Sequence, residues 1–281
     1  MTKVWFITGC SKGFGRALVE ELLKTTDAQV VATARNPEVL KDLQDQYGKR
    51  ILALKCDVTN THDIQNAVEQ TLVTFSKIDV LVNNAGYGLS GALEECAIDD
   101  IRSVFNTNVF GLITLTQAIL PIMRAQNSGH ILNVSSIAGL VGMAGAGIYC
   151  ATKFAVEGLS ESLAMEVACF GIKVTIIEPG PFRTDFAGSS IVMSPEYPAY
   201  REGPAALSRE RLRYLHNTQP GDPIKAAQIM IQITEMKEPP LRMLLGNSAV
   251  DRFSEKLKHE TEIFQKHEDL SRSADYNLNA A

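Results

Sequence analysis

The sequence has no surplus of positive charge: 27 Lys and Arg stand against 32 Asp and Glu, a formal net charge of −5. This balance argues against a nucleic-acid binder that works by neutralising phosphates. A low-hydrophobicity, high-charge composition is also absent, because 45% of the 281 residues are apolar and 21% are charged. Disorder is therefore excluded as the main state. Since no linker divides the chain, we expect a single domain over residues 1–281.

Metal-binding and disulfide patterns are missing as well. The five cysteines contain no C-x-x-C pair and the five histidines no H-x-x-x-H pair, which argues against a structural zinc site or a disulfide framework. No targeting peptide precedes the first strand-like run at 4–8, so a reduced, cytoplasmic setting is expected. Two uncharged stretches, 103–123 and 131–152, are long enough to span a membrane. Both carry polar residues that are costly in lipid, so we predict buried elements without membrane contact.

Short apolar runs alternate with helical patterns along most of the chain. Strand-like runs occur at 4–8, 29–34, 51–56, 78–82, 129–134, 173–177 and 241–245, and helical patterns at 13–25, 63–75, 99–124, 148–170 and 250–267. Continuous β-branched runs without polar alternation are typical of strands buried on both faces, as in a parallel sheet. The alternation predicts an α/β fold: a doubly wound, Rossmann-like parallel sheet of about seven strands with helices on both faces.

The segment 181–222 breaks this rhythm with prolines and aromatic residues. We predict a loop with short helices that acts as a mobile lid over a hydrophobic substrate; the alternative is that its apolar residues pack as a small satellite core. A C-terminal helix and tail are expected at 247–281, with residues 270–281 frayed.

The first strand leads into a glycine-rich turn, T-G-C-S-K-G-F-G at 8–15, and then into a helix. Glycines at such a junction let backbone N–H groups approach a phosphate, and the helix N-terminus adds partial positive charge. The strand before and the helix after favour a dinucleotide site over a turn without a ligand. The turn is not a P-loop, because G-x-x-x-x-G-K-[ST] is absent.

The end of the second strand lacks the acidic residue that binds the adenosine ribose in NAD-dependent dinucleotide folds. Arg35 follows this strand instead, and Lys12 lies in the glycine turn. An arginine can hold a 2′-phosphate through a bidentate, charge-assisted contact, although either cation alone would also suit a solvated surface. Together they predict NADP(H) rather than NAD(H).

Tyr149 and Lys153 lie four residues apart, which places them on one face of a helix at about 5–6 Å. A phenol with a pKa of ~10 is a slow proton donor at neutral pH, and we expect the neighbouring ammonium to lower that pKa. Ser136 stands just past a predicted strand, where the crevice of a parallel sheet lies. The three residues predict acid–base chemistry on a substrate oxygen.

The order of these motifs resembles that of the short-chain dehydrogenases/reductases. T-G-x-x-x-G-x-G at 8–15, N-N-A-G at 83–86, Asn108, S-S at 135–136, Y-x-x-x-K at 149–153 and P-G at 179–180 occur in the order of that family. The resemblance covers residues 3–185 and fits the single-domain branch. The G-C-S turn and the A-T-A-R strand end are similar to hydroxysteroid and retinol dehydrogenase-like members.

The resemblance implies a catalytic set of Asn108, Ser136, Tyr149 and Lys153. Tyr149 would be the general acid in reduction and the base in oxidation. Lys153 would hold the nicotinamide ribose, Ser136 rather than Ser135 would bind the substrate oxygen, and Asn108 would connect Lys153 to a water chain. The cofactor-binding positions from both lines of reasoning are Gly9, Ser11, Lys12, Gly13, Phe14, Gly15, Arg35, Asp57, Val58, Asn84, Ala85, Gly86, Tyr149, Lys153, Pro179, Gly180, Phe182 and Thr184.

These observations predict an NADP(H)-dependent oxidoreductase that moves a hydride between the nicotinamide and a carbonyl or secondary alcohol, reducing a hydrophobic ketone or aldehyde. A non-catalytic, redox-sensing NADP(H)-binding protein is the alternative, and the complete catalytic set argues against it. A methyltransferase on a similar sheet would need the missing acid after the second strand. Five apolar residues of the two long helices predict a homo-oligomer, a dimer or tetramer: Leu112, Leu115, Ile119, Leu159 and Leu163.

Overall fold

The centre of the molecule is a seven-stranded parallel sheet with the strand order β3-β2-β1-β4-β6-β7-β9. This computed structural model describes residues 2–215 and 217–276. The strands are β1 (Val4–Ile7), β2 (Gln29–Ala34), β3 (Ile51–Lys55), β4 (Val80–Asn83), β6 (Gly129–Val134), β7 (Ile172–Pro179) and β9 (Arg242–Leu245). Nearly all residues of the five inner strands are buried, as the continuous apolar runs predicted, whereas the edge strands β3 and β9 are partly exposed; the doubly wound sheet is confirmed.

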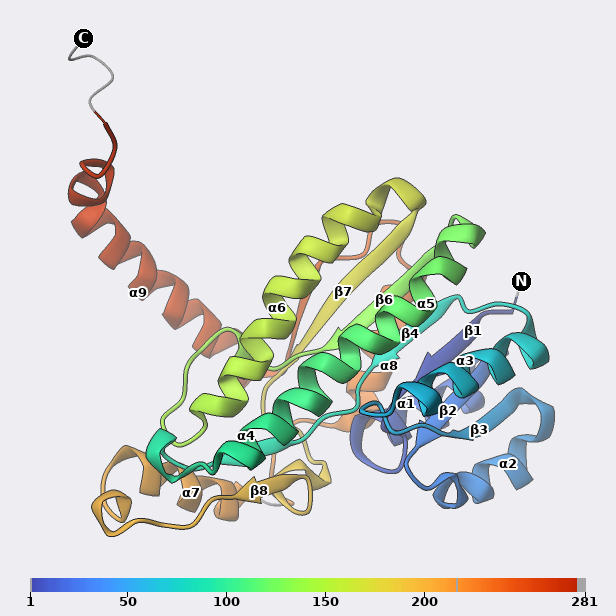
Figure 1. Ribbon diagram of the computed structural model, residues 1–281, viewed down its shortest axis with the longest axis horizontal. Coiled ribbons are helices and arrows are strands. Elements are labelled where there is room, and N and C mark those ends of the chain that lie inside the picture. Colours follow the sequence, from blue (N-terminus) through green and yellow to red (C-terminus); the bar gives the residue numbers. More distant parts are fainter. Residues whose placement is uncertain (1, 216, 277–281) are drawn as a thin grey trace.

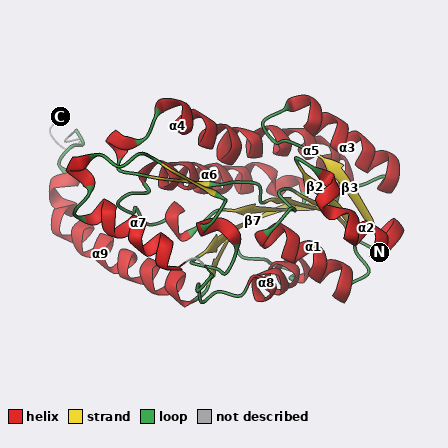
Figure 2. Ribbon diagram, turned by 90° about the horizontal axis from the view of Figure 1, so that it is seen from below, coloured by secondary structure: helices red, strands yellow, loops and turns green. Residues whose placement is uncertain are grey.

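Helices cover both faces of the sheet, giving three layers (Figures 1 and 2). On one face, α1 (Gly13–Thr25) packs against α8 (Pro223–Glu235), and α2 (Lys41–Tyr47) adds Leu43 to the same core. On the other face lie α3 (Thr61–Phe75), α5 (Leu112–Gln126) and α6 (Gly147–Val167), which enclose a second core around Phe6 and Val31. Because every strand pair of this sheet is parallel, the carboxyl ends of all seven strands meet at one edge.

Two helices of the first face lie where no helix was predicted. Leu43 is the buried residue of α2, so the sequence of this helix has no apolar periodicity from which a helix could be predicted. The sequence of α8 does carry a helix-start signal, because an aspartate at the N-cap is followed by a proline at the first helical position. In the structure Asp222 caps the helix that begins at Pro223, and its carboxylate accepts a hydrogen bond from Ile224 N at 2.8 Å.

The helix predicted at 99–124 is interrupted at Asn108, a predicted catalytic residue. α4 (Ile98–Phe105) and α5 are joined by a π-helical turn, Asn106–Gly111, which buries Asn108. Such turns are frequent at functional sites. By length and composition Ile98–Gln126 could cross a membrane, but Leu115 and Ile119 are fully buried against the sheet, as in the core helix of a globular fold.

The last helix, α9 (Asn247–Arg272), extends away from the body of the molecule (Figure 1). Ala249 near its start is buried, whereas nearly all residues beyond position 253 are exposed. The helix predicted at 250–267 is confirmed and is longer at both ends. Residues 270–272 of the tail predicted to fray are helical, and residues 277–281 lie outside the described part of the chain.

Candidate active site

A cleft of about 1090 Å³ opens at the carboxyl edge of the sheet. The strand order reverses between β1 and β4, and ligands of doubly wound sheets bind at such a switch point. The glycine turn after β1 and the loops after β4, β6 and β7 line the cleft. Every cofactor-binding or catalytic residue predicted from the sequence lines it except Gly15 and Asn108.

The glycine turn forms a cradle whose shape depends on residues beneath it. Gly9 and Gly13 have φ angles of +68° and +62°, which favour glycine. A Cβ atom on Gly15 would lie 2.5 Å from the Gly9 carbonyl oxygen, so a side chain there would displace the turn. The Asn84 amide donates to the carbonyl oxygens of Thr8 at 2.7 Å and Gly9 at 3.2 Å. Gly15 and Asn84 thus support the cradle.

Tyr149, Lys153 and Ser136 meet on the floor of the cleft. The first two lie on successive turns of α6, and Lys153 Nζ is 5.8 Å from the centre of the Tyr149 ring. Ser136 follows β6, and its hydroxyl is held by the Ala138 N–H at 3.1 Å and faces the phenol. The ring of Phe186 packs on the Tyr149 ring with a centroid distance of 5.4 Å. A carbonyl between these hydroxyls would be accessible from the cleft and covered by Phe186.

Burial dominates the electrostatics of this group. It raises the pKa of Tyr149 above its ordinary value, and the hydrogen bond with Ser136 opposes that rise. Burial also lowers the pKa of Lys153 to about 8, against the attraction of Glu157. Lys153 Nζ donates to the Val134 carbonyl oxygen at 2.9 Å rather than to the phenol. The pKa of Tyr149 is therefore raised and not lowered as expected: burial is the largest cause, and Ser136, not Lys153, is the group that opposes it.

Asn108 lies just behind the cleft wall and supports it. Its side-chain oxygen accepts a hydrogen bond from Tyr87 N at 3.0 Å, and its amide donates to Tyr87 O at 2.9 Å and to the Thr152 hydroxyl at 3.1 Å. Asn108 and Lys153 both lie close to Gly86: a Cβ atom added to Gly86 would be 3.0 Å from Asn108 Oδ1 and 3.8 Å from Lys153 Nζ. The π-helical turn thus brings Asn108 beside the lysine, without a direct hydrogen bond between them.

Comparison with known proteins now decides the family. The family model described as short chain dehydrogenase matches residues 3–193. The chain belongs to the short-chain dehydrogenase family. An oxidoreductase of Botryotinia fuckeliana is 43% identical over 89% of this chain and 91% of its own length. A 3-ketodihydrosphingosine reductase of Bacteroides thetaiotaomicron is 36% identical over 87% and 88%, and retinol dehydrogenase 8 of Bos taurus is 35% identical over 84% and 79%.

Solved structures agree with the fold of this short-chain dehydrogenase. A short-chain dehydrogenase from Streptomyces avermitilis superposes with a TM-score of 0.92 at 42% identity, covering 98% of this chain and all of its own. One from Burkholderia phymatum in complex with NAD has a TM-score of 0.80 at 26% identity, covering 94% and 95%. ElxO with NADP bound has a TM-score of 0.74 at 28% identity, covering 89% and 100%. The structural neighbours thus bind nicotinamide cofactors of both kinds.

Arg35 and Lys12, the two cations predicted to bind a 2′-phosphate, differ in whether they already pair with a carboxylate. Arg35 is exposed at the end of β2, lines the cleft and has no hydrogen bond or ion pair within residues 2–215 and 217–276. Lys12 forms an ion pair with Asp185, with 2.5 Å between Nζ and Oδ2, and also contacts the Ser189 hydroxyl. The ion pair lowers the pKa of Asp185 to about 2. Arg35 is therefore the cation that is open to an anionic ligand.

Phe182 lines the cleft, and its ring also packs within the protein. Its ring packs on Phe14 with a centroid distance of 5.1 Å and lies against Gly221, where a Cβ would come within 2.5 Å of the ring. The ring therefore joins the start of α1 to the two ends of the segment 181–222. Thr184 accepts a hydrogen bond from Phe186 N and begins a short 3-10 turn.

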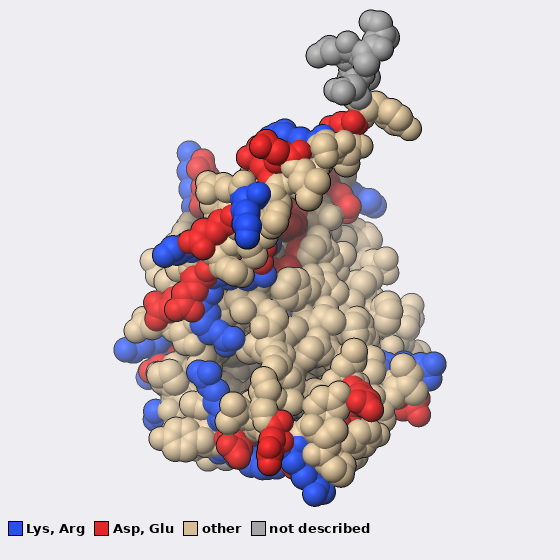
Figure 3. Space-filling model, turned by 90° about the vertical axis from the view of Figure 1, so that its left-hand side faces the viewer, with Lys and Arg blue, Asp and Glu red and all other residues tan. Residues whose placement is uncertain are grey.

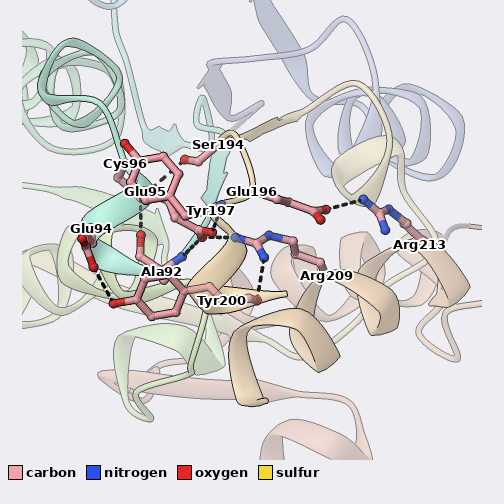
Figure 4. A network of polar contacts seen from close by, with 10 residues as sticks. All are labelled: Ala92, Glu94, Glu95, Cys96, Ser194, Glu196, Tyr197, Tyr200, Arg209 and Arg213. Carbon is pink, nitrogen blue, oxygen red and sulfur yellow. Dashed lines mark hydrogen bonds and ion pairs between the residues drawn. The ribbon is translucent and has the colours of Figure 1, made fainter. Parts of the chain in front are cut away.

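The described residues of the segment 181–222 form a cap over the cleft. Its strand β8 (Ile191–Met193) pairs in parallel with β5 (Gly88–Ser90), and its helix α7 (Pro204–Leu215) lies beyond the carboxyl edge of the sheet (Figure 1). A buried ion pair fixes α7 (Figure 4): the Arg209 guanidinium binds the Glu95 carboxylate, and neither side chain is more than 2% exposed. Sequence reasoning missed this pair, because 114 residues separate its partners.

The anchoring network extends from Glu95 in both directions (Figure 4). Its carboxylate also accepts hydrogen bonds from Ala92 N at 2.7 Å and Tyr197 N at 2.9 Å. The Tyr200 hydroxyl donates to Glu94 at 2.9 Å. The cap is thus held to the loop after β5 by several polar contacts, in addition to the β5–β8 strand pair.

Proposed function

We propose that this short-chain dehydrogenase is an NADP(H)-dependent reductase of a hydrophobic ketone or aldehyde, with Tyr149 as the general acid. The observation that carries the proposal is the meeting of Tyr149, Ser136 and Lys153 on the floor of a cleft that also contains the glycine cradle. A protein that only sensed NADP(H) would not need a proton donor and a hydroxyl partner at that point.

The residues of the cleft fit a nicotinamide cofactor. The cradle has no room for a Cβ on Gly15 and presents backbone to a phosphate, and the cleft continues from it without a break to Tyr149. Lys153 would hold the nicotinamide ribose, Arg35 the 2′-phosphate and Asp57 the adenine. When bound, the cofactor supplies the hydride.

The chain itself supplies orientation and a proton. Ser136 and Tyr149 would both donate hydrogen bonds to the substrate oxygen, and the phenol proton would move to that oxygen as it gains negative charge. The phenol of Tyr149 is protonated at neutral pH, as a general acid must be, but the burial that raises its pKa also makes it a weaker acid. The same groups, with the phenolate as base, would serve the reverse oxidation.

NADP(H) is proposed over NAD(H) on two features of the second strand. No acidic side chain ends β2, and Arg35 stands exposed at that point with no partner among the described residues. A phosphate bound there would gain a charge-assisted contact, whereas an NAD ribose would lack its usual carboxylate partner.

Replacing Tyr149 by Phe tests the proposal. The variant keeps the ring that packs on Phe186 but loses the transferable proton, so turnover of a hydrophobic ketone should fall by about 10²–10⁴-fold. NADPH affinity, followed by fluorescence titration, should stay within about twofold. Tyr214→Phe is the control, because that side chain is 81% exposed and outside the cleft. Near-wild-type turnover in Tyr149→Phe would refute the mechanism.

We also infer that two copies of the chain associate, but through other residues than those expected. Leu115 and Ile119 are fully buried within the chain, and Leu112 and Leu163 are nearly so, because their apolar period marks the core face of the helices. Exposed apolar side chains on the π-helical turn and on α6 include Phe110 at 56%, Phe154 at 44% and Met165 at 76%. A second copy covering this face would remove these side chains from water.

A further inference from the structure

The half of the cleft beyond Tyr149 has an unusual charge pattern. It is lined by the loop 142–146, by α7 and by the first turns of α9, and its walls are largely apolar. The charged side chains that line the cleft from α7 and α9 are Arg211 and Arg252, and no Asp or Glu of the described part of these two helices lines it. A carbonyl substrate that reaches Tyr149 therefore extends between apolar walls toward two positive charges.

Both arginines lie on helix faces directed into the cleft. Ser208 and Arg211 are three residues apart on α7, and Ser248 and Arg252 are four apart on α9; all four line the cleft. Arg252 Nη1 lies 3.3 Å from Met143 Sδ in the opposite wall. Figure 3 looks at this side of the molecule and shows Lys and Arg side chains gathered along one side of a hollow below α9.

Of the arginines in the segment 181–222, Arg209 and Arg213 pair with a carboxylate; in the described part of the chain Arg183, Arg201 and Arg211 do not, and neither does Arg252 of α9. Arg209 binds Glu95, and Arg213, two residues beyond Arg211, binds Glu196 at 3.0 Å. Within the described residues, Arg211 and Arg252 take part in no ion pair; the one polar contact of Arg252 is with the methionine sulfur. Two guanidinium groups and two hydroxyls that line one cleft are a donor set that suits a carboxylate or phosphate oxygen.

We infer that the substrate carries an anionic group, separated by an apolar body from the carbonyl that is reduced. The carbonyl would lie at Tyr149 and Ser136, the apolar body along Leu207 and Leu212, and the anion between Arg211 and Arg252. The substrate class is therefore an apolar oxo acid or the phosphate ester of an apolar ketone. This inference rests on the proposed function and adds an orientation: the charged end points toward α9.

Matched substrates test the inference. Wild-type enzyme is assayed with NADPH on a long-chain aryl keto acid, its methyl ester and the corresponding keto phosphate. We expect a kcat/KM at least about tenfold higher for the better of the two anions than for the ester, as one charge-assisted hydrogen bond contributes. The anion with the higher kcat/KM identifies the anionic group of the substrate as a carboxylate or a phosphate. Calorimetry on the same protein measures the binding of two substrate analogues that lack the carbonyl group, one as the free acid and one as the methyl ester.

Two variants and a control assign the effect to these residues. Arg252→Gln and Arg211→Gln should each raise KM for the anion about tenfold and leave kcat/KM for the ester within about twofold. Arg213→Gln, on the same helix but outside the cleft, should change neither. Equal kcat/KM for acid, phosphate and ester in the wild type, or an equal loss on all three in Arg252→Gln, overturns the inference. Ketone turnover that survives Tyr149→Phe would instead refute the proposed function.

Discussion

Removal of the buried guanidinium in Arg209→Met should open the cap while the rest of the fold stays intact. The substitution leaves the Glu95 carboxylate buried with two backbone donors but without its counter-charge. Removing one partner of a buried ion pair costs about 3–5 kcal/mol, because the remaining charge is uncompensated. Since Ala205 and Arg209 are the buried residues of α7, little apolar packing opposes its detachment. The cost should therefore be met by local opening rather than global unfolding.

Hydrogen exchange measures this opening segment by segment. At the lower bound of about 3 kcal/mol, amide protection across residues 204–215 should fall by about 100-fold, while protection of β1 and β6 stays unchanged. KM for large carbonyl substrates should rise, and NADPH affinity should stay the same, because the glycine cradle does not touch this pair.

Two further variants separate charge from packing. Arg213→Met removes an exposed ion pair, with partners 65% and 40% exposed, and should cost less than about 1 kcal/mol. Glu95→Gln combined with Arg209→Met leaves no buried charge and should recover part of the lost protection. Unchanged exchange at 204–215 in Arg209→Met, or an equal fall in every element, would show that the pair does not hold the cap.

Three other outcomes follow from the geometry. Arg35→Gln should weaken NADPH binding by about 10–100-fold and leave NADH binding unchanged in parallel titrations; equal losses for both would exclude a 2′-phosphate contact. Burial lowers the pKa of His130 to about 4, so between pH 6.5 and 4 the unfolded state binds the extra proton, and stability should fall by on the order of 3 kcal/mol as the pH drops. His130→Gln should flatten that part of a urea-midpoint profile, and an unaltered slope would contradict it. Phe154→Glu should convert a dimer to a monomer by light scattering; a monomeric wild type at micromolar concentration would refute the shared face.

Much of the fold and the floor of the cleft could be predicted from the sequence. The strands of the main sheet are buried on both faces, so continuous apolar runs mark them without help from distant residues. In a parallel sheet each strand delivers the residues that follow it to the same edge. The turn at 8–15, Ser136 and the residues after Pro179 therefore had to lie together once their strands were placed, and Tyr149 and Lys153 were fixed by helical spacing.

What only the tertiary structure decided depends on pairs far apart in the chain. The β5–β8 sheet joins three-residue strands about 100 residues apart, and the Glu95–Arg209 pair joins residues that each suit a solvated helix or turn in isolation. The contact of Arg252 with Met143 follows from where α9 leaves the sheet. The raised pKa of Tyr149 follows from how deeply α6 is buried, and helical spacing carries no information about depth. Local periodicity thus determined the elements and the edge where the cleft lies, whereas desolvation and long-range packing set the pKa of Tyr149 and the walls of the cleft.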